Sequence, residues 1–379
     1  MNHNWTYKKL GEVATITMGQ SPTSDTYNES EGLPFFQGNA DFGKLHPNVR
    51  IYCNAPIRIA DNDDVLISVR APIGAINIAD RKCCIGRGLA AIRGNEKRQS
   101  RFIYYLLLAS KDKLVAQGTG STFKSIGKDA LYNLSVPSVS LETQSRIVAE
   151  LDLLQAIIDK QKAQLAELDN LAQCIFYDMF GDPVDNDKGW EVKKLGEVTN
   201  KISDGVHAKP NYTETGMPFI SVVNINRGKL IFDDCKYVSQ TDGETFNKRT
   251  KPEKGDILYT KVGATYGISA LVDVDVDFCL YVSVCLIKPK RELLDSLFLT
   301  HMMRLPYIKN QADERIRGIG VPDLHLNQIS AFDVIVPPLS LQQSFAAKIE
   351  SIEKQKAAIS QSIAETQRLF DYTMDKYFG

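Results

Sequence analysis

Two long stretches of the sequence carry the seven-residue apolar pattern of a coiled-coil helix. In the first, from Leu141 to Gly181, apolar residues recur at alternating steps of four and three, which is the spacing of a heptad seam. These positions are Ile147, Leu151, Leu154, Ile158, Leu165, Leu168, Ile175 and Met179, with Gln161 and Ala172 in the two gaps. At roughly 1.5 Å per residue such a helix would be about 60 Å long. It therefore needs a second helix to pack on.

The end of the chain supplies this second helix. The last stretch repeats the first at a constant shift of 198 residues, so that Ile147 falls on Phe345 and Phe180 falls on Phe378. The remaining sequence is duplicated as well. The motif YKKLGEV after Trp5 recurs as EVKKLGEV after Trp190, and DDVLISVRAPIG (63–74) is matched by GDILYTKVGATYG (255–267). Short apolar runs broken by Gly and Asn predict strands and turns in both copies.

The duplication predicts an α+β chain of two β-rich globules and two long helices. If a two-fold rotation relates the copies, the helices pair as an antiparallel two-helix coiled coil with one globule at each end, a pseudo-two-fold internal duplication. The segment GDPVDNDKGW (181–190) has the composition of a linker. The predicted parts are 1–140 for the first globule, 141–181 for the central helix, 182–340 for the second globule and 341–379 for the C-terminal helix.

Composition narrows the functional classes. The chain has 379 residues, of which 43% are hydrophobic and 24% are charged. The sequence contains no run of eighteen apolar residues, so it predicts no membrane span. The seven cysteines form no CxxC pair and favour buried thiols in a reducing cytoplasm, where we expect the protein. The net charge of −1 means that contact with DNA would depend on local clusters or on partner subunits.

Several motifs together resemble the specificity (S) subunit of type I restriction-modification enzymes. They are Trp-x-x-(K)-KLGEV, Gly-Asp-Ile-Leu, GSTFKSI (120–126), and Val-Pro followed by a helix start of Gln-x-x-Ile (144–147) or Gln-x-x-Phe (342–345). The resemblance covers the whole chain and its duplication. One departure is GIGVPDLHL, which replaces GSTFKSI in the second copy and leaves open whether this turn has the same role in both halves.

The resemblance implies a fold and a set of partners. In that family each β-rich globule is a target recognition domain that reads one half of a split site in double-stranded DNA. The two helices hold these domains apart and dock two methyltransferase (M) subunits. Motor-nuclease (R) subunits complete the restriction complex.

A search for catalytic motifs agrees with a non-enzymatic role. The only Pro-Pro, in VIVPPLSL, lacks the flanking polar and aromatic residues of a DNA methyltransferase motif, and GSTFKSIGKD lacks the spacing of a phosphate-binding loop. The five histidines have no ligand spacing. We therefore expect no catalytic residue, cofactor or metal. The competing classes are a self-contained DNA-modifying enzyme, disfavoured by these absences, and a coiled-coil adaptor without DNA, disfavoured by the divergent polar loops.

Polar and cationic residues in turns where the copies differ are the candidate DNA contacts, because Arg and Lys read guanine, Asn and Gln read adenine, and hydroxyls and lysines contact phosphates. In the first copy they are Gln37, Asn39, Lys44, Arg70, Arg87, Thr119, Ser121, Thr122 and Lys124. In the second copy they are Asn224, Asn226, Arg227, Lys229, Lys261, Tyr266, Arg315 and Arg317. The alternative for each is an ordinary solvated loop residue.

The long helices carry more apolar residues than one seam can cover. The candidate partner-binding residues are Leu153, Ile157, Leu171, Phe176, Phe180, Tyr377 and Phe378. Two interpretations stay open at this point. Either a partner subunit docks on these residues, or the globules of the same chain cover them.

Overall fold

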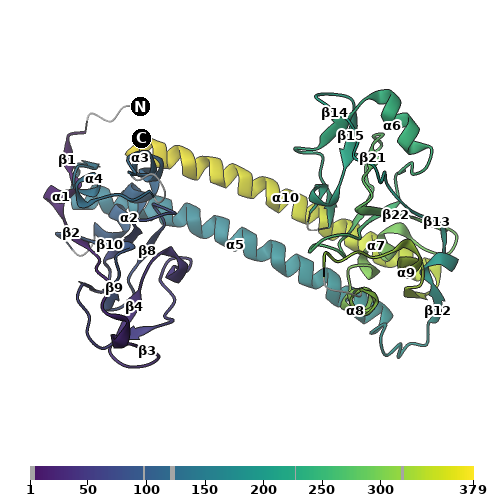
Figure 1. Cartoon of the computed structure of the whole chain (residues 1–379), viewed down its shortest axis with the longest axis horizontal. Helices are drawn as coiled ribbons and strands as arrows, with labels where there is room; N and C mark the ends of the chain where they lie inside the picture. Colours follow the sequence, from purple (N-terminus) through teal and green to yellow (C-terminus); the bar gives the residue numbers. More distant parts are fainter. Residues whose placement is uncertain (1–4, 97–98, 120–123, 227, 317–319) are drawn as a thin grey trace. The chain divides into compact units, whose positions relative to one another are not determined.

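The computed structural model describes residues 5–96, 99–119, 124–226, 228–316 and 320–379, and the chain divides into two compact units (Figure 1). Unit 1 comprises Met1–Ala163 and Ile359–Gly379, and unit 2 comprises Gln164–Ala358. The two long helices are α5 (Leu141–Phe180) and α10 (Leu339–Phe378), teal and yellow in Figure 1. Each contributes one segment to each unit, and both lie within two residues of the bounds that the heptad pattern predicts.

Within each unit the two helix segments run antiparallel. In unit 1 the Tyr377 hydroxyl donates to the Glu150 carboxylate at 2.7 Å, and the Gln161 amide donates to the Ser362 hydroxyl at 2.7 Å. Residue numbers thus rise along α5 as they fall along α10. Gln161 is a polar residue in the seam, and its side-chain N–H donates across the pair, as expected of a polar seam position that fixes register.

The ends of the paired helices are packed and their middles are more exposed. The last fully buried residue in the first part of α5 is Ile158, and the next is Ala172. On α10 the corresponding residues are Ile352 and Phe370. The buried residues of the two long helices are, in unit 1, Ile147, Leu151, Leu154, Ile158, Phe370, Met374, Tyr377 and Phe378, and in unit 2, Ala172, Phe176, Phe180, Phe345, Ile349 and Ile352.

The β-rich part of unit 1 contains two sheets. The first is antiparallel and has the order β2 (Ala14–Met18), β10 (Leu89–Gly94), β7 (Val65–Ser68), β8 (Ile76–Ile78). The second has the order β3 (Tyr27–Asn28), β5 (Tyr52–Cys53), β4 (Leu33–Phe36), β9 (Cys83–Ile85), β6 (Ile59–Ala60). Strands β4 and β9 are parallel. The helices are α1 (Leu10–Val13), α2 (Ser100–Ala109), α3 (Lys111–Ala116) and α4 (Lys128–Tyr132).

Unit 2 repeats this plan. Its first sheet has the order β13 (Thr199–Asp204), β22 (Val284–Pro289), β19 (Ile257–Thr260), β20 (Ser269–Leu271). The second has the order β14 (Tyr212–Thr213), β18 (Lys236–Val238), β15 (Met217–Ile220), β21 (Cys279–Leu280), with β15 and β21 parallel. A hairpin of β16 (Ile225–Asn226) and β17 (Lys229–Leu230) is added. The helices are α6 (Gln240–Asn247), α7 (Ser296–Met302), α8 (Pro306–Arg315) and α9 (Leu326–Ser330).

In both copies a short strand pair and a buried glutamine lead into the long helix. Strand β1 (Tyr7–Lys9) pairs with β11 (Ser135–Pro137), and β12 (Glu191–Lys194) pairs with β23 (Asp333–Val336). The glutamine of the Gln-x-x-Ile/Phe motif then donates to the backbone just before the helix. Gln144 reaches the Val139 carbonyl at 3.2 Å, and Gln342 reaches that of Pro337 at 2.8 Å. The predicted α+β class and internal duplication are confirmed.

Candidate nucleic-acid interface

Backbone hydrogen bonds join separate loops of unit 1 at one edge of its sheets. The N–H of Gly86 donates to the Phe36 carbonyl at 2.8 Å, which ties the loop after β9 to the loop after β4. The N–H of Val69 donates to the Gly88 carbonyl at 2.9 Å, and the N–H of Ile126 donates to the Val69 carbonyl at 3.0 Å. Side chains from distant parts of the sequence are thereby fixed close together.

These loops surround an open hollow of about 260 Å³. Four of the predicted DNA-contacting residues line it: Gln37, Asn39, Arg70 and Arg87. The other lining residues are Ser21, Gly38, Ser68, Ala71 and Gly88, so no acidic residue is among them. The hollow therefore combines two guanidinium groups with two side-chain amides, which are the groups that read base edges.

A buried carboxylate holds one wall of this hollow. Asp41, which is only 4% exposed, accepts hydrogen bonds from the backbone N–H of Gln37 at 2.7 Å and of Gly38 at 3.3 Å. The guanidinium of Arg50 donates to the same carboxylate, with its Nε at 2.8 Å. The loop that carries Gln37 and Asn39 is thus ordered by the protein itself.

The remaining predicted residues of unit 1 lie in different places. Thr119 and Ser125 exchange backbone hydrogen bonds at 3.0 and 2.9 Å, and Ser125 also forms a β-bridge with Arg70, so Thr119 and Lys124 belong to a loop beside the hollow. Ser121 and Thr122 lie outside the described residues. Lys44 does not line the hollow, because its ammonium group pairs with Asp159 of α5 at 2.8 Å.

Unit 2 repeats these backbone hydrogen bonds between loops, and we call the repeated arrangement the backbone frame. The N–H of Tyr281 donates to the Ile220 carbonyl at 2.9 Å, as Gly86 does to Phe36 in unit 1. The N–H of Leu324 donates to the Lys261 carbonyl at 2.9 Å, as Ile126 does to Val69. Leu324 therefore makes the same backbone contact in unit 2 as Ile126 makes in unit 1, although the sequences around them differ.

The side chains on this second frame are different, and they correct the expectation for Lys261. Lys261 is only 4% exposed, and its ammonium group lies 3.1 Å from Asp323 and 3.7 Å from the buried Asp204. Asp204 also accepts from Arg249 at 2.6 Å and lies 3.2 Å from the Nε2 atom of His207. Lys261 is thus an interior ion-pair residue in this structure. The more exposed basic side chains here are Arg249, which belongs to the basic run NKRTKPEK (247–254) that is evident in the sequence, and His207, which sequence reasoning missed.

The signal that could have found His207 is the alignment of the two copies. The strand register pairs Met18 with Ala90 and Asp204 with Cys285, which places Asp204 at the position of Met18. His207 then follows Gly205 as Ser21 follows Gly19. A residue in this turn is a candidate in both copies, although nothing in the local composition marks it.

The side chains of three further predicted residues of unit 2 make hydrogen bonds within the protein. Asn224 is 4% exposed, accepts from the Ser221 backbone at 3.1 Å and plays the loop-ordering role of Asp41. Tyr266 donates its hydroxyl hydrogen to Asp313. Arg315 donates to the carbonyl of Gln311 at 2.6 Å. Asn226 lies in strand β16, and Arg227 and Arg317 lie outside the described residues.

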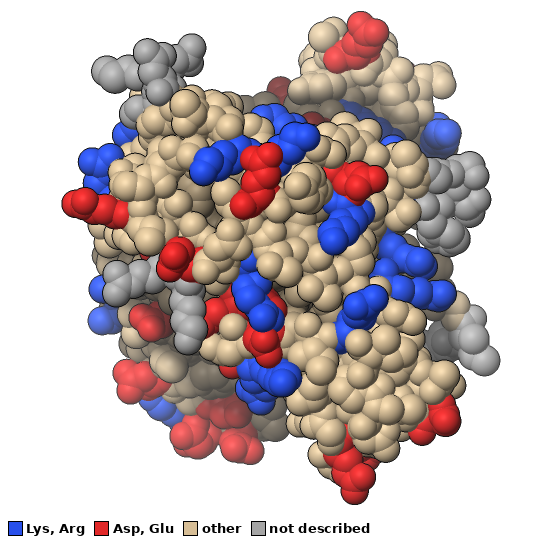
Figure 2. Space-filling view, turned by 90° about the vertical axis from the view of Figure 1, so that its left-hand side faces the viewer, with Lys and Arg blue, Asp and Glu red and all other residues tan. Residues whose placement is uncertain are grey.

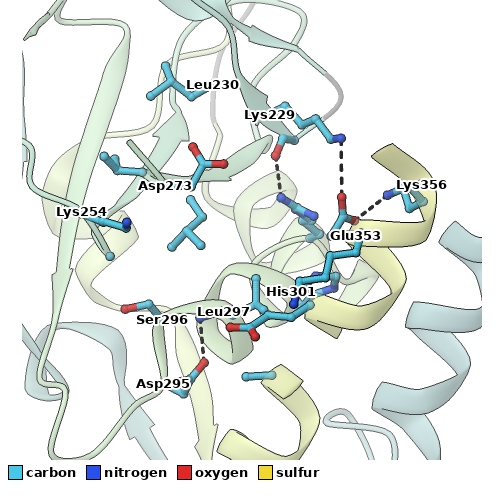
Figure 3. Close-up of a pocket in the computed structure, with 18 of the residues that line it drawn as sticks. Lys229, Leu230, Lys254, Asp273, Asp295, Ser296, Leu297, His301, Glu353 and Lys356 are labelled. Atoms are coloured by element: carbon cyan, nitrogen blue, oxygen red, sulfur yellow. Dashed lines mark hydrogen bonds and ion pairs between the residues drawn. The ribbon is translucent and has the colours of Figure 1, made fainter. Parts of the chain in front are cut away.

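Lys229 belongs to a second hollow, of about 690 Å³, between the β-rich part of unit 2 and α10 (Figure 3). Figure 3 shows Glu353 between the ammonium groups of Lys229 and Lys356, at 3.5 and 2.6 Å. Lys44 and Lys229 occupy the repeated Gly-Lys-Leu motif, and each pairs with a carboxylate on a long helix of its own unit. Both lysines face the helices, which does not support the prediction that they contact DNA.

His301 lines the same hollow and is uncharged at neutral pH. Its ring lies 5.6 Å from the Phe345 ring in an edge-to-face arrangement. Burial, together with the nearby cations Arg304 and Lys356, lowers the pKa of His301 to about 3. Within the part of the chain that the structure describes, no group of three or more His, Cys, Asp or Glu side chains could hold a metal ion.

The predicted partner surface on the helices separates into exposed and buried residues. Leu153, Ile157 and Leu171 are 62%, 37% and 46% exposed. In contrast, Phe176, Phe180, Tyr377 and Phe378 are at most 8% exposed, because the ends of the long helices fill the cores of the two units. Phe378 packs on Phe102 of α2 at 5.2 Å, and Phe180 packs on Phe298 of α7 at 4.8 Å. These four residues are core residues, which corrects the expectation that they form a surface.

Charges of both signs are mixed on the surface. On the face drawn in Figure 2, blue lysine and arginine side chains lie among red acidic ones over most of the surface, and several lie close together at the right-hand side of the view. Among the described residues, no helix is both long enough and apolar enough to cross a membrane.

The chain contains two copies of a β-rich unit. Each copy has an ordered cluster of polar loops and a segment of the paired long helices. These features define the class of the protein as a two-unit recognition scaffold. The sequence profile of the Type I restriction modification DNA specificity domain matches residues 2–170 and again residues 187–367. The chain belongs to this family of type I restriction-modification specificity subunits.

Individual relatives agree with this assignment. The chain is 44% identical over 169 residues to the putative type I restriction enzyme MjaX specificity subunit of Methanocaldococcus jannaschii, a match that covers 43% of this chain and 40% of that protein. It is 22% identical over 382 residues to the MjaIX specificity subunit of the same organism, covering 92% of this chain and 87% of the relative. The EcoBI specificity subunit of Escherichia coli is 21% identical and covers all of this chain and 86% of the relative.

Solved structures share the fold. The S subunit of the type I restriction-modification system from M. genitalium matches with a TM-score of 0.59 at 15% identity, over 100% of this chain and 97% of that one. A chain from a study of complex assembly and conformational transition of the type I R-M system matches with a TM-score of 0.61 at 20% identity, over 99% and 97%.

Proposed function

We propose that this chain is the DNA-recognition subunit of a type I restriction-modification complex and has no active site of its own. Each unit reads one half of a bipartite site in double-stranded DNA. One observation carries the proposal: the two units present the same backbone frame of hydrogen-bonded loops but different side chains on it. A repeated frame with different contact groups is what two independent readers of different sequences require.

The helices supply the docking surface in this proposal. Leu153 and Ile157 lie one turn apart on α5, and Leu369 and Tyr372 lie one turn apart on α10, and all four are exposed. Exposed apolar residues on a helix pair favour a partner subunit that covers them. We assign that role to two methyltransferase subunits, with motor-nuclease subunits joining in the full complex.

The proposed function is tested by exchanging the DNA-recognition part of unit 1. Residues of about 15–135 are replaced by the matching span of a relative, the chain is expressed with its methyltransferase subunits, and the methylated positions in genomic DNA are sequenced. One half of the recognised site should change and the other should stay. If both halves change together, the units are not independent readers. The chain alone, supplied with S-adenosylmethionine, should methylate nothing.

A second test treats the paired helices as the element that sets the gap between half-sites. Insertion of one heptad into each helix, after Gln161 and after Ile359, preserves the seam and adds about 10 Å of helix. This corresponds to about three base pairs of unread DNA. Three base pairs also rotate one half-site by roughly 100° about the duplex, so binding should weaken while both half-sites persist. An active variant that keeps the original gap would show that the helices do not set it.

A further inference from the structure

Arg70 and Arg87 differ from four other arginines of unit 1 because they have no ion-pair partner among the described residues. Arg50 pairs with Asp41, Arg81 with Asp80, Arg93 with Asp61 and Asp64, and Arg101 with Asp152. Arg70 and Arg87 instead line a hollow that contains no carboxylate. Both side chains are exposed, so their guanidinium donors are available to a ligand.

The backbone that carries these two arginines is fixed. The Ser68 hydroxyl donates to the Pro72 carbonyl at 2.8 Å and accepts from the Ala75 N–H at 2.8 Å, which closes the loop that contains Arg70. The N–H of Arg87 donates to the Ser21 hydroxyl at 3.2 Å. Because the loops are ordered before any ligand arrives, little entropy is lost in presenting the two guanidinium groups.

Glycine leaves this surface open to close approach. A Cβ atom on Gly88 would lie 2.3 Å from the Gln37 carbonyl oxygen, so only glycine allows the two loops to meet here. Gly38 lines the same hollow and has open space where its side chain would be. A base edge can therefore reach the guanidinium groups without obstruction from Gly38.

The matching positions of unit 2 carry no cation. The bridge between Arg70 and Ser125 corresponds to the bridge between Val262 and Asp323, so Val262 occupies the position of Arg70. The register of β10 and β22 on their neighbours places Val282 at the position of Arg87. A valine offers no hydrogen-bond donor from its side chain and can only make apolar contacts, for example with the methyl group of thymine.

On the basis that unit 1 reads DNA as proposed above, we propose that Arg70 and Arg87 each recognise a guanine in the half-site of unit 1. The guanidinium fork donates two hydrogen bonds to the O6 and N7 atoms of guanine in the major groove. Unit 2 makes no guanine contact from the same two positions. The two halves of the recognised site therefore differ in their dependence on guanine for a structural reason.

The test uses the full chain assembled with its methyltransferase subunits and a library of double-stranded DNA with randomised half-sites. The wild-type complex should enrich a bipartite site with guanine in one half. Arg70→Ala and Arg87→Ala should each reduce the preference for guanine at one position of that half by roughly 5- to 150-fold. The other half, read by unit 2, should be enriched unchanged, which also shows that each variant is folded.

Two further variants sharpen the result. Arg87→Gln should shift the preference at its position from guanine toward adenine, because a glutamine amide pairs with adenine, and misfolding cannot produce such a shift. Arg146→Ala removes an exposed arginine on α5 outside the hollow and should leave the enriched site unchanged.

Three outcomes contradict the proposal in distinguishable ways. If an alanine variant weakens binding to all sequences equally and reduces the salt dependence by about one phosphate, the arginine contacts the backbone of DNA rather than guanine. If the wild-type site has no guanine in the half that the variants alter, the guanine assignment is wrong while the proposed function stands. If the wild-type complex enriches no sequence at all, the proposed function itself fails.

Discussion

At the end of strand β2, unit 1 has Met18, and at the matching position of β13, unit 2 has the buried Asp204. The next matched pair behaves in the same way, since Val69 of unit 1 corresponds to Lys261 of unit 2. Val69 belongs to the apolar core of unit 1 and the partly buried Met18 packs against it, whereas Asp204 and Lys261 form an ion pair. One backbone frame thus tolerates either an apolar pair or a charged pair beneath its loop cluster.

This difference also determines where the free cations lie. Unit 1 keeps its interior apolar here and exposes the unpaired Arg70 and Arg87. Unit 2 places valines at the two arginine positions and holds Arg249, His207 and Lys261 around one carboxylate. Duplication therefore preserved the hydrogen-bonded frame while the charges on it changed. The following predictions test that separation, beginning with the largest expected effect.

Transplanting the apolar pair of unit 1 into unit 2 should reveal strong coupling. Asp204→Met alone leaves the buried Lys261 with the partly exposed Asp323, 3.1 Å away, in place of its buried counter-charge and should lower the free energy of unfolding by about 3 kcal/mol. The double variant Asp204→Met with Lys261→Val removes both charges and should recover most of that loss. Urea unfolding of the full chain and both single variants completes the double-mutant cycle. Strictly additive effects would mean that the two charges do not interact.

Much of this frame was predictable from the sequence, and the pairing of charges was not. The heptad spacing predicts both long helices, because the apolar residues of each helix repeat along its own sequence. The repeated motifs located matching strands and turns. The ion pairs of Lys44 and Lys229 could not be predicted, because their partners, Asp159 and Glu353, lie more than a hundred residues away in the chain. Ion pairing depends on tertiary neighbours, which local composition does not encode.

The burial of the aromatic residues at the helix ends also could not be predicted from the local sequence. Phe176 and Phe180 exceed what one seam can bury, so a partner surface was a reasonable interpretation. The structure places them against Phe298 of α7, at 5.6 and 4.8 Å. The short helix α7 buries these two rings, and the sequence pattern alone does not show where α7 lies relative to the long helix. Leu153 and Ile157 stay exposed and remain a prediction of partner contact.

The shared frame itself can be tested at a matched pair of glycines. A Cβ atom on Gly19 would lie 2.2 Å from the Gly86 carbonyl oxygen, and one on Gly205 would lie 1.9 Å from that of Leu280. Gly19→Ala and Gly205→Ala should each lower the free energy of unfolding by about 2 kcal/mol, because the backbone on the other side must move. Gly38→Ala is the control, since a Cβ atom there meets open space. Equal stability of all three variants would mean that the loops are not tightly joined.

The smallest expected effect concerns a position where the units differ in chemistry. Phe102 and Phe298 pack on the ends of α10 and α5 respectively, and three residues later α2 has Tyr105 where α7 has His301. The Tyr105 hydroxyl donates to Asp152 of α5 at 2.5 Å. Burial keeps the folded-state pKa of His301 at about 3. In the unfolded chain a histidine binds a proton below a pH of about 6.5.

Because the unfolded state then binds more protons than the folded state, the contribution of His301 to stability is present above a pH of about 6.5 and is lost as the pH falls toward 3. His301→Tyr, which introduces the residue of unit 1, should remove this part of the acid sensitivity, a difference of about 1 kcal/mol at pH 5.5. Urea unfolding of both proteins from pH 7.5 to 4.5 measures it. His325→Gln, at an exposed histidine, should leave the wild-type pH dependence intact. Parallel pH curves for wild type and His301→Tyr would show that His301 gains its proton in the folded protein, and that this part of unit 2 is open to water.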